Sequence, residues 1–421
     1  MKTSTTPYAT IGRKLPHSYS EKIHNAFGKY PFSLIELEPE EAREFMLHDA
    51  FKGITITIPY KKLALEVASW TSPTARKIGC ANTLLRCSDG SLKAYNTDYE
   101  GFKYMARKAN VSFQGAKVLI LGSGGTSLTT RTVAADEGAR EVVIVSRTGD
   151  VNYGNVKELH ADADIIINAT PVGMYPNTAE QPIDLSAFPH LRAALDVIYN
   201  PMRTRFTQQA IRLGFAHCDA LRMLVAQAFY AMEIFLGEKQ PEAMIEEVTA
   251  LIRKETANIV LTGMPGSGKT TIGKLVAERL GRTFVDTDEL IVAKAGMPIP
   301  DIFATKGEEG FRQIEAEAIA DVAKKSSLVI ATGGGAVLRE ENRLNLAQNG
   351  FVFWLNRPLE ALQLGNGRPL SSSREAVAAL FEQREPLYRQ TSDAIVNNND
   401  TPSTVAQKII NDVTTIIHRS N

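Results

Sequence analysis

Two glycine-rich segments of this 421-residue chain have the composition of phosphate-binding loops, and they differ in kind. The first reads Leu121-Gly122-Ser123-Gly124-Gly125-Thr126-Ser127, and the second reads Gly263-Met264-Pro265-Gly266-Ser267-Gly268-Lys269-Thr270. The first is a variant of the GxGxxG loop that holds a dinucleotide pyrophosphate. The second is a complete GxxxxGKT loop, which holds a nucleoside triphosphate. A chain with both loops is expected to run two reactions.

The first loop and its surroundings favour NADP as the cofactor. Gly122, Gly124 and Gly125 allow a tight turn and a close approach of backbone N–H groups to the pyrophosphate. NAD sites place an acidic side chain at the end of the next strand, where this chain has Ser146-Arg147-Thr148. A guanidinium and a hydroxyl at Arg147 and Thr148 suit a 2′-phosphate instead.

The second loop predicts a site for ATP and Mg²⁺. The backbone N–H groups of the loop and of the first helical turn form an anion nest, and the lysine reaches the β- and γ-phosphates. The following hydroxyl is a Mg²⁺ ligand. The residues expected to bind the nucleotide are Gly266, Ser267, Gly268, Lys269, Thr270 and Thr271, with Thr270 also on the metal.

The elements that must position these loops read as an α/β protein with parallel sheets, because strand-like and helix-like runs alternate. Apolar strands at 117–121 and 258–262 lead into the two loops, with 141–145 and 163–167 as neighbours of the first. Residues 54–58 alternate in polarity and predict a half-buried strand. An apolar stripe over 241–255 predicts a helix, which places a boundary near 255. Trp70 and Trp354 are predicted to pack in cores.

The composition excludes several classes of partner. Hydrophobic residues make up 44% and charged residues 22%, and 47 basic residues balance 47 acidic ones, so nothing attracts nucleic acid or an anionic membrane. No apolar leader or membrane span is evident. Three cysteines without metal-ligand spacing suggest reduced thiols and a cytoplasmic location. The sequence leaves the oligomeric state open.

Residues 8 to about 252 resemble shikimate dehydrogenase through six motifs in order. These are His17-Ser18-Tyr19-Ser20, Thr57-Ile58-Pro59-Tyr60-Lys61, Gly79-Cys80-Ala81-Asn82-Thr83, Asn96-Thr97-Asp98, Asn168-Ala169-Thr170-Pro171 and Met223-Leu224-Val225-Ala226-Gln227. The resemblance implies that Lys61 donates a proton and that Asp98 orients it and holds a substrate hydroxyl. It implies substrate contacts at Ser18, Ser20, Thr57, Asn82, Tyr199 and Gln227.

Residues 257 to about 418 resemble shikimate kinase. The motifs are the second glycine loop, Asp286-Thr287-Asp288, Gly310-Phe311-Arg312 at the start of a long helix, Thr332-Gly333-Gly334-Gly335, Arg368-Pro369-Leu370 and Arg384-Glu385-Pro386-Leu387-Tyr388. The resemblance implies a catalytic role for Asp288 and for Lys269, and assistance to Mg²⁺ from Asp286. It implies that Arg312, Gly334 and Arg384 bind the substrate acid, and that Arg368 belongs to a lid over the nucleotide.

Together the resemblances imply a bifunctional enzyme of aromatic biosynthesis. One half reduces 3-dehydroshikimate to shikimate with NADPH, and the other phosphorylates shikimate at its 3-hydroxyl with ATP and Mg²⁺. The expected domains are an α/β substrate-binding domain (1–105 with 219–254), a Rossmann dinucleotide-binding domain (106–218), and a P-loop, NMP-kinase-like three-layer α/β domain (256–421).

Two departures from the dehydrogenase pattern keep alternatives open. Arg222 stands where the family has glycine near the nicotinamide, and a large residue there is expected to hinder cofactor binding or to alter the cofactor's pose. The segment after Thr148 is short and lacks a further basic residue. One alternative is a kinase with a non-catalytic shikimate-binding regulatory module. Another is a dehydrogenase half that prefers quinate or NAD. In the kinase half, the arginine that stacks on adenine before the lid is replaced by Leu362-Gln363-Leu364.

Overall fold

The computed structural model describes residues 7–16, 18–362 and 374–419, and its elements fall into two compact units. The first unit contains the described residues up to Met174 together with Glu180–Tyr199 and Phe206–Ile252. The second contains Tyr175–Ala179, Asn200–Arg205 and the described residues from Arg253 onward. Each unit is described by itself.

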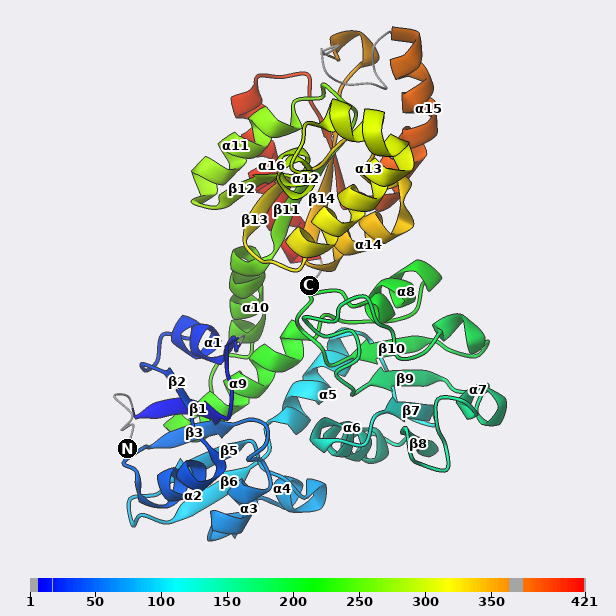
Figure 1. Cartoon of the computed structure of the whole chain (residues 1–421). Helices are drawn as coiled ribbons and strands as arrows, with labels where there is room; N and C mark the ends of the chain where they lie inside the picture. Colours follow the sequence, from blue (N-terminus) through cyan, green and yellow to red (C-terminus); the bar gives the residue numbers. More distant parts are fainter. Residues whose placement is uncertain (1–6, 17, 363–373, 420–421) are drawn as a thin grey trace. The chain divides into compact units, whose positions relative to one another are not determined.

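The first sheet of the first unit is mixed, with the strand order β2-β1-β3-β5-β6-β4 (Figure 1). Its strands are β1 (Tyr8–Gly12), β2 (Ser33–Glu36), β3 (Gly53–Ile56), β4 (Trp70–Thr71), β5 (Thr83–Arg86) and β6 (Leu92–Tyr95). β3 runs parallel to β1, whereas β5 is antiparallel to both β3 and β6. The segments after β1, β3 and β6 and the segment before β5 therefore share one edge of the sheet.

The second sheet of the first unit is wholly parallel, with the order β10-β9-β7-β8. Its strands are β7 (Lys117–Leu121), β8 (Glu141–Val145), β9 (Ile165–Asn168) and β10 (Ala193–Asp196). Around it lie α6 (Gly125–Asp136), α7 (Val156–Leu159), η1 (Leu185–Ala187) and α8 (Arg205–Leu213). The first glycine loop joins β7 to α6, at the edge where the carboxyl ends of β8 and β9 also emerge.

Two long helices lie between these sheets (Figure 1). They are α5 (Asp98–Lys108) and α9 (Leu221–Leu236). The other helices near the first sheet are α1 (Ser20–Ala26), α2 (Pro39–His48), α3 (Leu63–Val67), α4 (Pro73–Ile78) and α10 (Ala243–Thr256). A glycine allows α5 and α9 to touch, since a Cβ at Gly101 would lie 2.7 Å from the Met223 carbonyl oxygen and 3.0 Å from Gln227 Cβ.

The second unit is a three-layer α/β domain. Its parallel sheet has the order β12-β13-β11-β14-β15, made of β11 (Asn258–Thr262), β12 (Thr283–Asp286), β13 (Leu328–Ala331), β14 (Gly350–Asn356) and β15 (Ala394–Asn397). The helices are α11 (Lys269–Leu280), α12 (Thr287–Ala295), α13 (Ile299–Ala323), η2 (Ala336–Leu338), α14 (Glu340–Gln348), η3 (Leu359–Ala361), α15 (Arg374–Thr391) and α16 (Pro402–Arg419). Figure 1 shows α11 and α16 on one face of the sheet and α13 and α14 on the other.

Most strand predictions are confirmed, but the predicted half-buried strand at 54–58 and the predicted core position of Trp70 are wrong. The strands before both glycine loops have the expected bounds. The strand expected at 54–58 ends at Ile56, and all of its residues are buried. The polar Thr55 can be buried because its Oγ1 lies 2.6 Å from Thr10 Oγ1 on the neighbouring strand, within hydrogen-bond distance. Trp354 is a core residue at 1% exposure, but Trp70 is 43% exposed and lies against Tyr95 at the end strand of the sheet.

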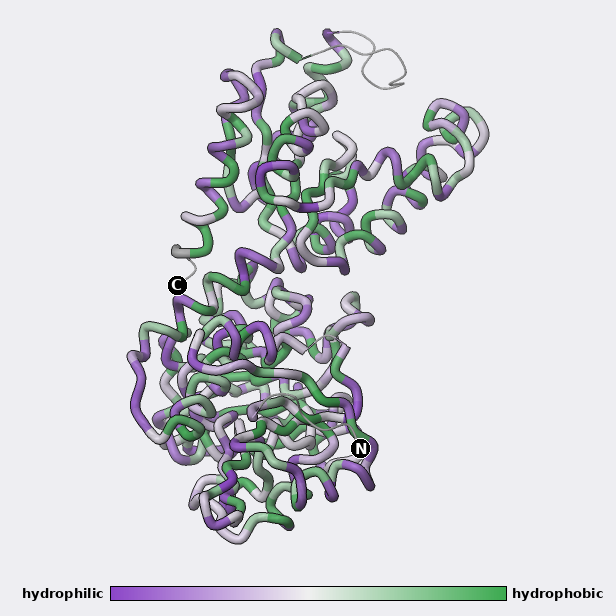
Figure 2. Tube along the Cα trace, turned by 90° about the vertical axis from the view of Figure 1, so that its left-hand side faces the viewer, coloured by the Kyte–Doolittle hydropathy of each residue, from purple (hydrophilic) through white to green (hydrophobic). Residues whose placement is uncertain are grey.

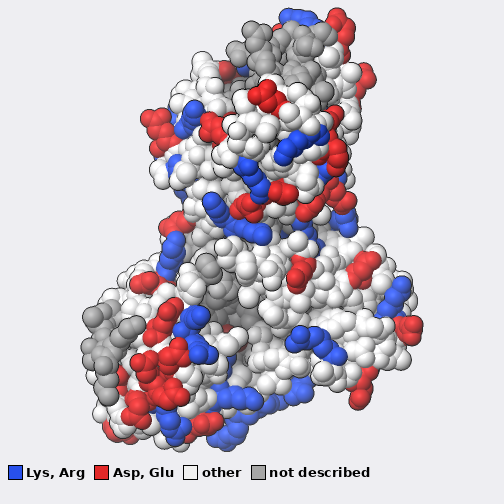
Figure 3. Space-filling model, viewed as in Figure 1, with Lys and Arg blue, Asp and Glu red and all other residues white. Residues whose placement is uncertain are grey.

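The helices and the surface are of mixed polarity. Among the described residues, no helix is both long and apolar enough to cross a membrane, and Figure 2 shows hydrophobic and hydrophilic residues mixed along the helices. Figure 3 shows side chains of both charges scattered over the visible face of each unit.

We predict that Gly101→Ala destabilises the first unit by about 1–3 kcal/mol, because the new methyl group meets backbone that cannot move aside. Thermal unfolding followed by Trp70 fluorescence in a Trp354→Phe background measures this. Gly125→Ala is the matched control: it begins a helix with no atom within 4 Å of the new Cβ, so stability should not fall. Equal stability of the two variants contradicts the prediction.

Candidate active sites

A lysine and an aspartate form an ion pair at the shared edge of the first sheet. Lys61 follows β3 and Asp98 begins α5, and Lys61 Nζ lies 2.6 Å from Asp98 Oδ2. Their side chains are 20% and 13% exposed, so the pair is shielded but reachable. The predicted partnership of Lys61 and Asp98 is present in the geometry.

The pKa of Lys61 reflects two opposing effects. Burial lowers it, while the charge of Asp98 and the hydrogen bond to it raise it, and the net result is a pKa above the ordinary lysine value. The ammonium is therefore fully charged at neutral pH. Because the folded pKa lies above the unfolded one, the pair stabilises the fold at neutral pH. This contribution is lost only as the pH rises through the folded pKa.

An amide network extends the site from Asp98 toward α9. Asn82 Nδ2 donates to Thr97 Oγ1 at 3.1 Å and to Gln227 Oε1 at 3.3 Å. Asn82 Oδ1 accepts from the Thr97 backbone N–H at 2.7 Å. Asn82 and Gln227 are nearly fully buried, so their orientation is fixed. The structure brings together Asn82, Gln227 and the residue preceding Asp98, as the motifs imply.

The serine pair lies in the loop after β1. Ser18 Oγ donates to Ser20 Oγ at 3.2 Å, and Ser20 is the first residue of α1. The ring of Tyr19, between them, lies 5.3 Å from the ring of Tyr199. Burial, with the neighbouring Tyr19 adding, raises the pKa of Tyr199 to about 12. Thr57 directly follows β3, and its N–H donates to the Ile11 carbonyl of β1 at 3.0 Å.

The first glycine loop has the backbone of a phosphate-binding turn. Gly122 has φ of 101°, and a Cβ there would lie 2.9 Å from Thr170 Cγ2, so only glycine fits. Gly124 caps α6 and Gly125 begins it, and a Cβ on either would meet nothing within 4 Å. The loop is thus open on the side of the helix N-terminus, which suits an anion.

Arg147 and Thr148 lie at the next strand end, as expected. Both follow β8, which is the parallel neighbour of β7, and both are exposed. The structure thus places them on the same edge as the glycine loop.

Arg222 is held by groups of the same unit. Its Nε donates to Glu246 Oε1 at 3.1 Å and Oε2 at 3.2 Å, and its Nη1 lies 3.7 Å from Cys218 Sγ. Only 4% of its side chain is exposed. The guanidinium is engaged with α10, which argues against the expected obstruction of the cofactor by this residue.

The second glycine loop wraps the lysine. Lys269 Nζ donates to the carbonyl oxygens of Gly263 and Met264 at 2.8 and 2.9 Å. Gly268 has φ of 91°, a conformation that other residues rarely adopt. Asn398 Nδ2 donates to the Ser267 carbonyl at 2.6 Å and fixes the loop from the end of β15. Gly266 and Thr271 also line the cavity beneath the loop.

Thr270 and two aspartates lie on one side of that cavity. Thr270 Oγ1 donates to Asp286 Oδ2 at 2.8 Å, and Asp286 Oδ1 accepts from the Asp288 backbone N–H at 3.0 Å. The described residues contain no cluster of three or more His, Cys, Asp or Glu side chains fit to hold a metal. A hydroxyl and one carboxylate match Mg²⁺, which keeps several waters and takes further oxygens from phosphates.

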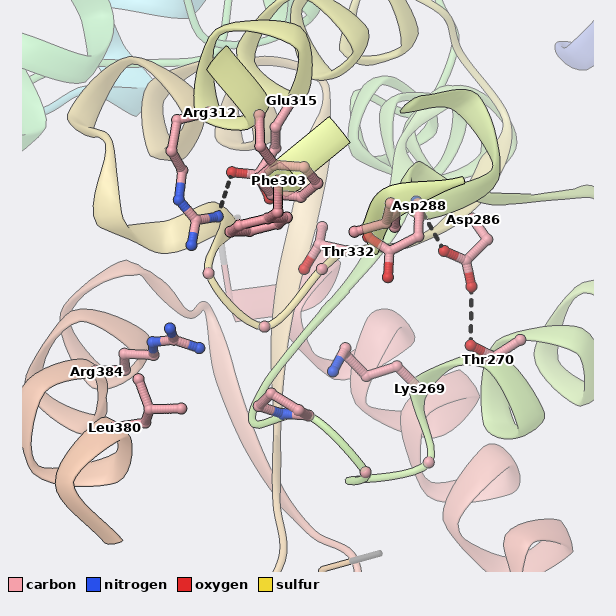
Figure 4. A pocket seen from close by; sticks show the side chains of 18 of the residues that line it. Lys269, Thr270, Asp286, Asp288, Phe303, Arg312, Glu315, Thr332, Leu380 and Arg384 are labelled. Carbon is pink, nitrogen blue, oxygen red and sulfur yellow. Dashed lines mark hydrogen bonds and ion pairs between the residues drawn. The ribbon is translucent and has the colours of Figure 1, made fainter. Parts of the chain in front are cut away.

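The cavity itself, of about 250 Å³, joins these groups to two arginines (Figure 4). Figure 4 shows Lys269 pointing into it, with Arg312 and Arg384 on one side and Asp288 on the other. The Nε atoms of both arginines are buried and have no hydrogen-bond acceptor among the described residues. Unpartnered guanidinium donors in a cavity fit an anionic ligand such as a carboxylate.

Glu315 also lines the cavity, and the sequence motifs assigned it no role. Arg312 Nη1 donates to Glu315 Oε2 at 2.8 Å, and the glutamate side chain is 1% exposed. Burial raises the pKa of Glu315 above its ordinary value, opposed by Arg312. The spacing of three residues on a helix was the available signal, because such residues share a face. α13 is interrupted at Gly307, so its second part begins near Glu308, as the motif suggested.

The glycines after β13 are required by close packing. A Cβ at Gly334 would lie 2.6 Å from Pro265 Cδ, and one at Gly335 would overlap the Arg312 guanidinium. Tyr388 donates a hydrogen bond to the Gly334 carbonyl. Apolar side chains complete the lining: Phe311, which belongs to the Gly310-Phe311-Arg312 motif, and Ile299, Phe303 and Leu380, which no motif indicated. Arg368 lies outside the described residues.

Known families match both parts of the chain. The shikimate dehydrogenase substrate binding domain model matches residues 10–84, and the shikimate kinase model matches residues 265–414. The shikimate dehydrogenase (NADP(+)) of Clostridium perfringens strain SM101 is 33% identical over 262 residues, covering 57% of this chain and 96% of that protein. The shikimate kinase of Symbiobacterium thermophilum is 53% identical over 144 residues, covering 32% and 83%. The chain belongs to both families.

A solved structure supports the assignment of the first unit. The crystal structure of shikimate dehydrogenase 1 from Peptoclostridium difficile has 32% identity and a TM-score of 0.53, and covers 58% of this chain and 97% of that one. The expected α/β folds and the two family resemblances are confirmed. We refer below to the first unit as the dehydrogenase unit and the second as the kinase unit.

We predict that Asp98→Asn lowers the pKa of Lys61, because burial then acts without the opposing carboxylate. Competitive labelling of lysines by acetic anhydride across pH, read by mass spectrometry, measures this. The Lys61 labelling curve should move to lower pH, while the exposed neighbour Lys62 serves as the internal control. An unchanged Lys61 curve contradicts this account of the pair.

Proposed function

We propose that this chain catalyses two consecutive reactions: reduction of 3-dehydroshikimate to shikimate with NADPH, and phosphorylation of shikimate to shikimate 3-phosphate with ATP. The observation that supports this proposal most directly is that each unit holds its own set of polar side chains suited to one of the two reactions. The Lys61–Asp98 pair supports the first reaction, and the cavity that joins Lys269 and Asp288 to two arginines supports the second.

In the dehydrogenase unit, NADPH supplies the hydride. Reduction of a ketone leaves an oxyanion that must gain a proton, and the Lys61 ammonium is the donor. Asp98 keeps Lys61 charged and turned toward the site, and accepts a hydrogen bond from a substrate hydroxyl. The pair is only partly exposed, so water competes weakly for these contacts.

The remaining polar groups orient the substrate ring. Ser18 and Ser20, which follow β1, and Tyr199, which follows β10, bind the carboxylate. Asn82, Gln227 and Thr57 bind hydroxyl groups of the ring. The fixed amide network of Asn82 supports this division, because buried amides in a set orientation discriminate between donors and acceptors.

The residues proposed for the dinucleotide are those of the first loop and the next strand end. Gly122, Gly124 and Gly125 present backbone N–H groups to the pyrophosphate. Arg147 and Thr148 bind the 2′-phosphate. The open space at Gly124 and Gly125 fits a bulky anion, and the exposed guanidinium fits a phosphate at the neighbouring strand end.

In the kinase unit, ATP supplies the phosphoryl group and Mg²⁺ neutralises charge on it. Gly266, Ser267, Gly268, Lys269 and Thr271 hold the phosphates, with Thr270 and Asp286 near the metal. Asp288 accepts the proton of the substrate hydroxyl. Arg312 and Arg384 bind the carboxylate beside the Gly334 backbone. Glu315 holds Arg312 in place.

We also propose that the chain is divided into three domains and is located in the cytoplasm. We assign residues 1–105 with 219–254 to substrate binding, 106–218 to the dinucleotide and 256–421 to the kinase. The three sheets support it, because β1–β6, β7–β10 and β11–β15 fall one within each range. The free state of Cys80, Cys87 and Cys218 supports a cytoplasmic location.

Reciprocal lysine variants test whether both units catalyse. Lys61→Ala should lower NADPH oxidation by about 10²-fold or more, because the proton donor is lost, and leave ATP-dependent phosphorylation unchanged. Lys269→Ala should lower ATP-dependent phosphorylation and leave NADPH oxidation unchanged. A coupled assay with 3-dehydroshikimate, NADPH and ATP–Mg²⁺ follows NADPH loss and ADP formation together, so each variant is the control for the other.

Distinct outcomes separate the alternatives. A folded wild-type chain that phosphorylates shikimate but oxidises no NADPH indicates a regulatory module in place of a dehydrogenase. Turnover with quinate or NADH in preference to 3-dehydroshikimate and NADPH indicates a dehydrogenase that prefers quinate or NAD.

Arg384→Lys should raise the KM for shikimate in the kinase reaction by roughly 10- to 100-fold, because an ammonium cannot bind a carboxylate with two parallel hydrogen bonds. The KM for ATP should change less than threefold. Initial rates at varied shikimate and ATP measure both. Arg389→Lys is the control, since Arg389 is on the same helix but more exposed and paired with Glu385. An equal rise in both KM values for Arg384→Lys contradicts the assignment.

A further inference from the structure

A carboxylate of α10 joins the two helices that carry the dehydrogenase site. Glu246 Oε1 accepts a hydrogen bond from Tyr104 of α5 at 2.8 Å and from Nε of Arg222 of α9 at 3.1 Å. Nζ of Lys108, also on α5, lies 3.3 Å away. One side chain thus receives donors from both helices.

The electrostatics make this contact strong. The Arg222 side chain is 4% exposed and that of Glu246 is 18% exposed, so both charges are largely removed from water. Burial raises the pKa of Glu246, but hydrogen bonds from Arg222 and Tyr104 outweigh it and the net pKa lies below the ordinary value. Glu246 is ionised at neutral pH, and loss of either partner leaves a buried charge unbalanced.

The same helix pair is joined again at the substrate end. There, Asn82 donates to Thr97, which precedes α5, and to Gln227 of α9. Between the two junctions, Gly101 lets α5 lie directly on Met223 and Gln227. Asp98 lies six residues before Tyr104 on α5, about 9 Å along the helix, and Gln227 lies five residues after Arg222 on α9.

We propose that Glu246 is a positioning residue of the dehydrogenase, which fixes α5 against α9 and thereby sets the separation of Asp98 and Gln227. The inference rests on the proposed function of that unit. Helices are stiff over two turns, so a change at the Glu246 junction is transmitted to both substrate-binding side chains. Arg222 then serves as the buried partner of this junction.

The junction acts on substrate binding more than on the cofactor. Asp98 and Gln227 face the substrate, whereas the glycine loop belongs to the other sheet of the unit. A loosened junction therefore weakens the fit of the hydroxylated ring and leaves the dinucleotide contacts in place. A merely structural role would instead lower the amount of active enzyme without changing either KM.

The first test is Glu246→Gln in the full-length chain. We expect the KM for 3-dehydroshikimate to rise about tenfold and kcat to fall a few-fold, because a small displacement of positioning groups costs this much. The KM for NADPH should change less than twofold. Kinase kcat and both kinase KM values, measured on the same sample, should match wild type and calibrate the protein concentration.

Glu247→Gln is the matched control. It lies on the same helix, is exposed, and removes the same charge from the chain. It should leave all dehydrogenase constants unchanged. If Glu246→Gln, folded as judged by circular dichroism, has the same KM for 3-dehydroshikimate as Glu247→Gln, the proposal is overturned.

A milder variant covers the case in which Glu246→Gln does not fold. Tyr104→Phe removes only the hydroxyl donor of α5 and keeps the buried ring. We expect a rise of about threefold in the KM for 3-dehydroshikimate, and no further effect of Tyr104→Phe when Glu246→Gln is already present. A wild-type KM for Tyr104→Phe, or fully additive effects in the double variant, refutes transmission through α5. Absence of NADPH oxidation by the wild-type chain instead refutes the proposed function.

Discussion

Parallel strands bring their carboxyl ends to the same edge of a sheet, and the polar groups of this protein are gathered by that constraint. In the kinase unit, β11, β12 and β13 end at the glycine loop, Asp286 and Thr332. In the dehydrogenase unit, β7 and β8 end at Gly122 and Ser146. The mixed sheet obeys the same rule, because reversal of β5 brings Asn82, which precedes it, to the edge where Lys61 follows β3.

Charges that leave water must then find partners, and three ion pairs meet this need. Lys61 with Asp98, Arg312 with Glu315, and Arg222 with Glu246 each join a basic group to a shielded carboxylate. Desolvation opposes the attraction within such pairs, so each contributes less net stability than the attraction alone would give. Their main effect is geometric, because each fixes the position of a side chain or of one helix against another.

Sequence reasoning succeeded where the signal is local. The strands before the two loops, the loops and the motif residues at their ends lie as expected, because each depends on a few consecutive residues. It failed for Trp70, whose apolar neighbours gave no sign that its strand ends the sheet. The alternating polarity of 54–58 also predicted a half-buried strand, whereas Thr55 is buried. Its hydroxyl is satisfied by Thr10, a partner 45 residues away that the local pattern does not reveal.

The parts that could not be foreseen are contacts over long separations. Asn82 and Gln227 are 145 residues apart, and each was identified by resemblance without any indication that they bond. Glu246 had no motif at all, since its three donors come from α5 and α9. Arg222 was read as an obstacle because the sequence shows a large residue but not the carboxylate that draws it aside.

The carbonyl oxygens that bind Lys269 affect which anions the glycine loop of the kinase unit favours. Gly263 and Met264 already offer the ammonium two dipoles at 2.8 and 2.9 Å, so the gain from an incoming ligand is measured against a lysine that is already partly satisfied. A diffuse monovalent ion such as chloride gains little over two well-aligned carbonyls, whereas adjacent phosphate groups of high charge density gain much more. The two carbonyl contacts therefore favour anions of high charge density over diffuse ones at Lys269.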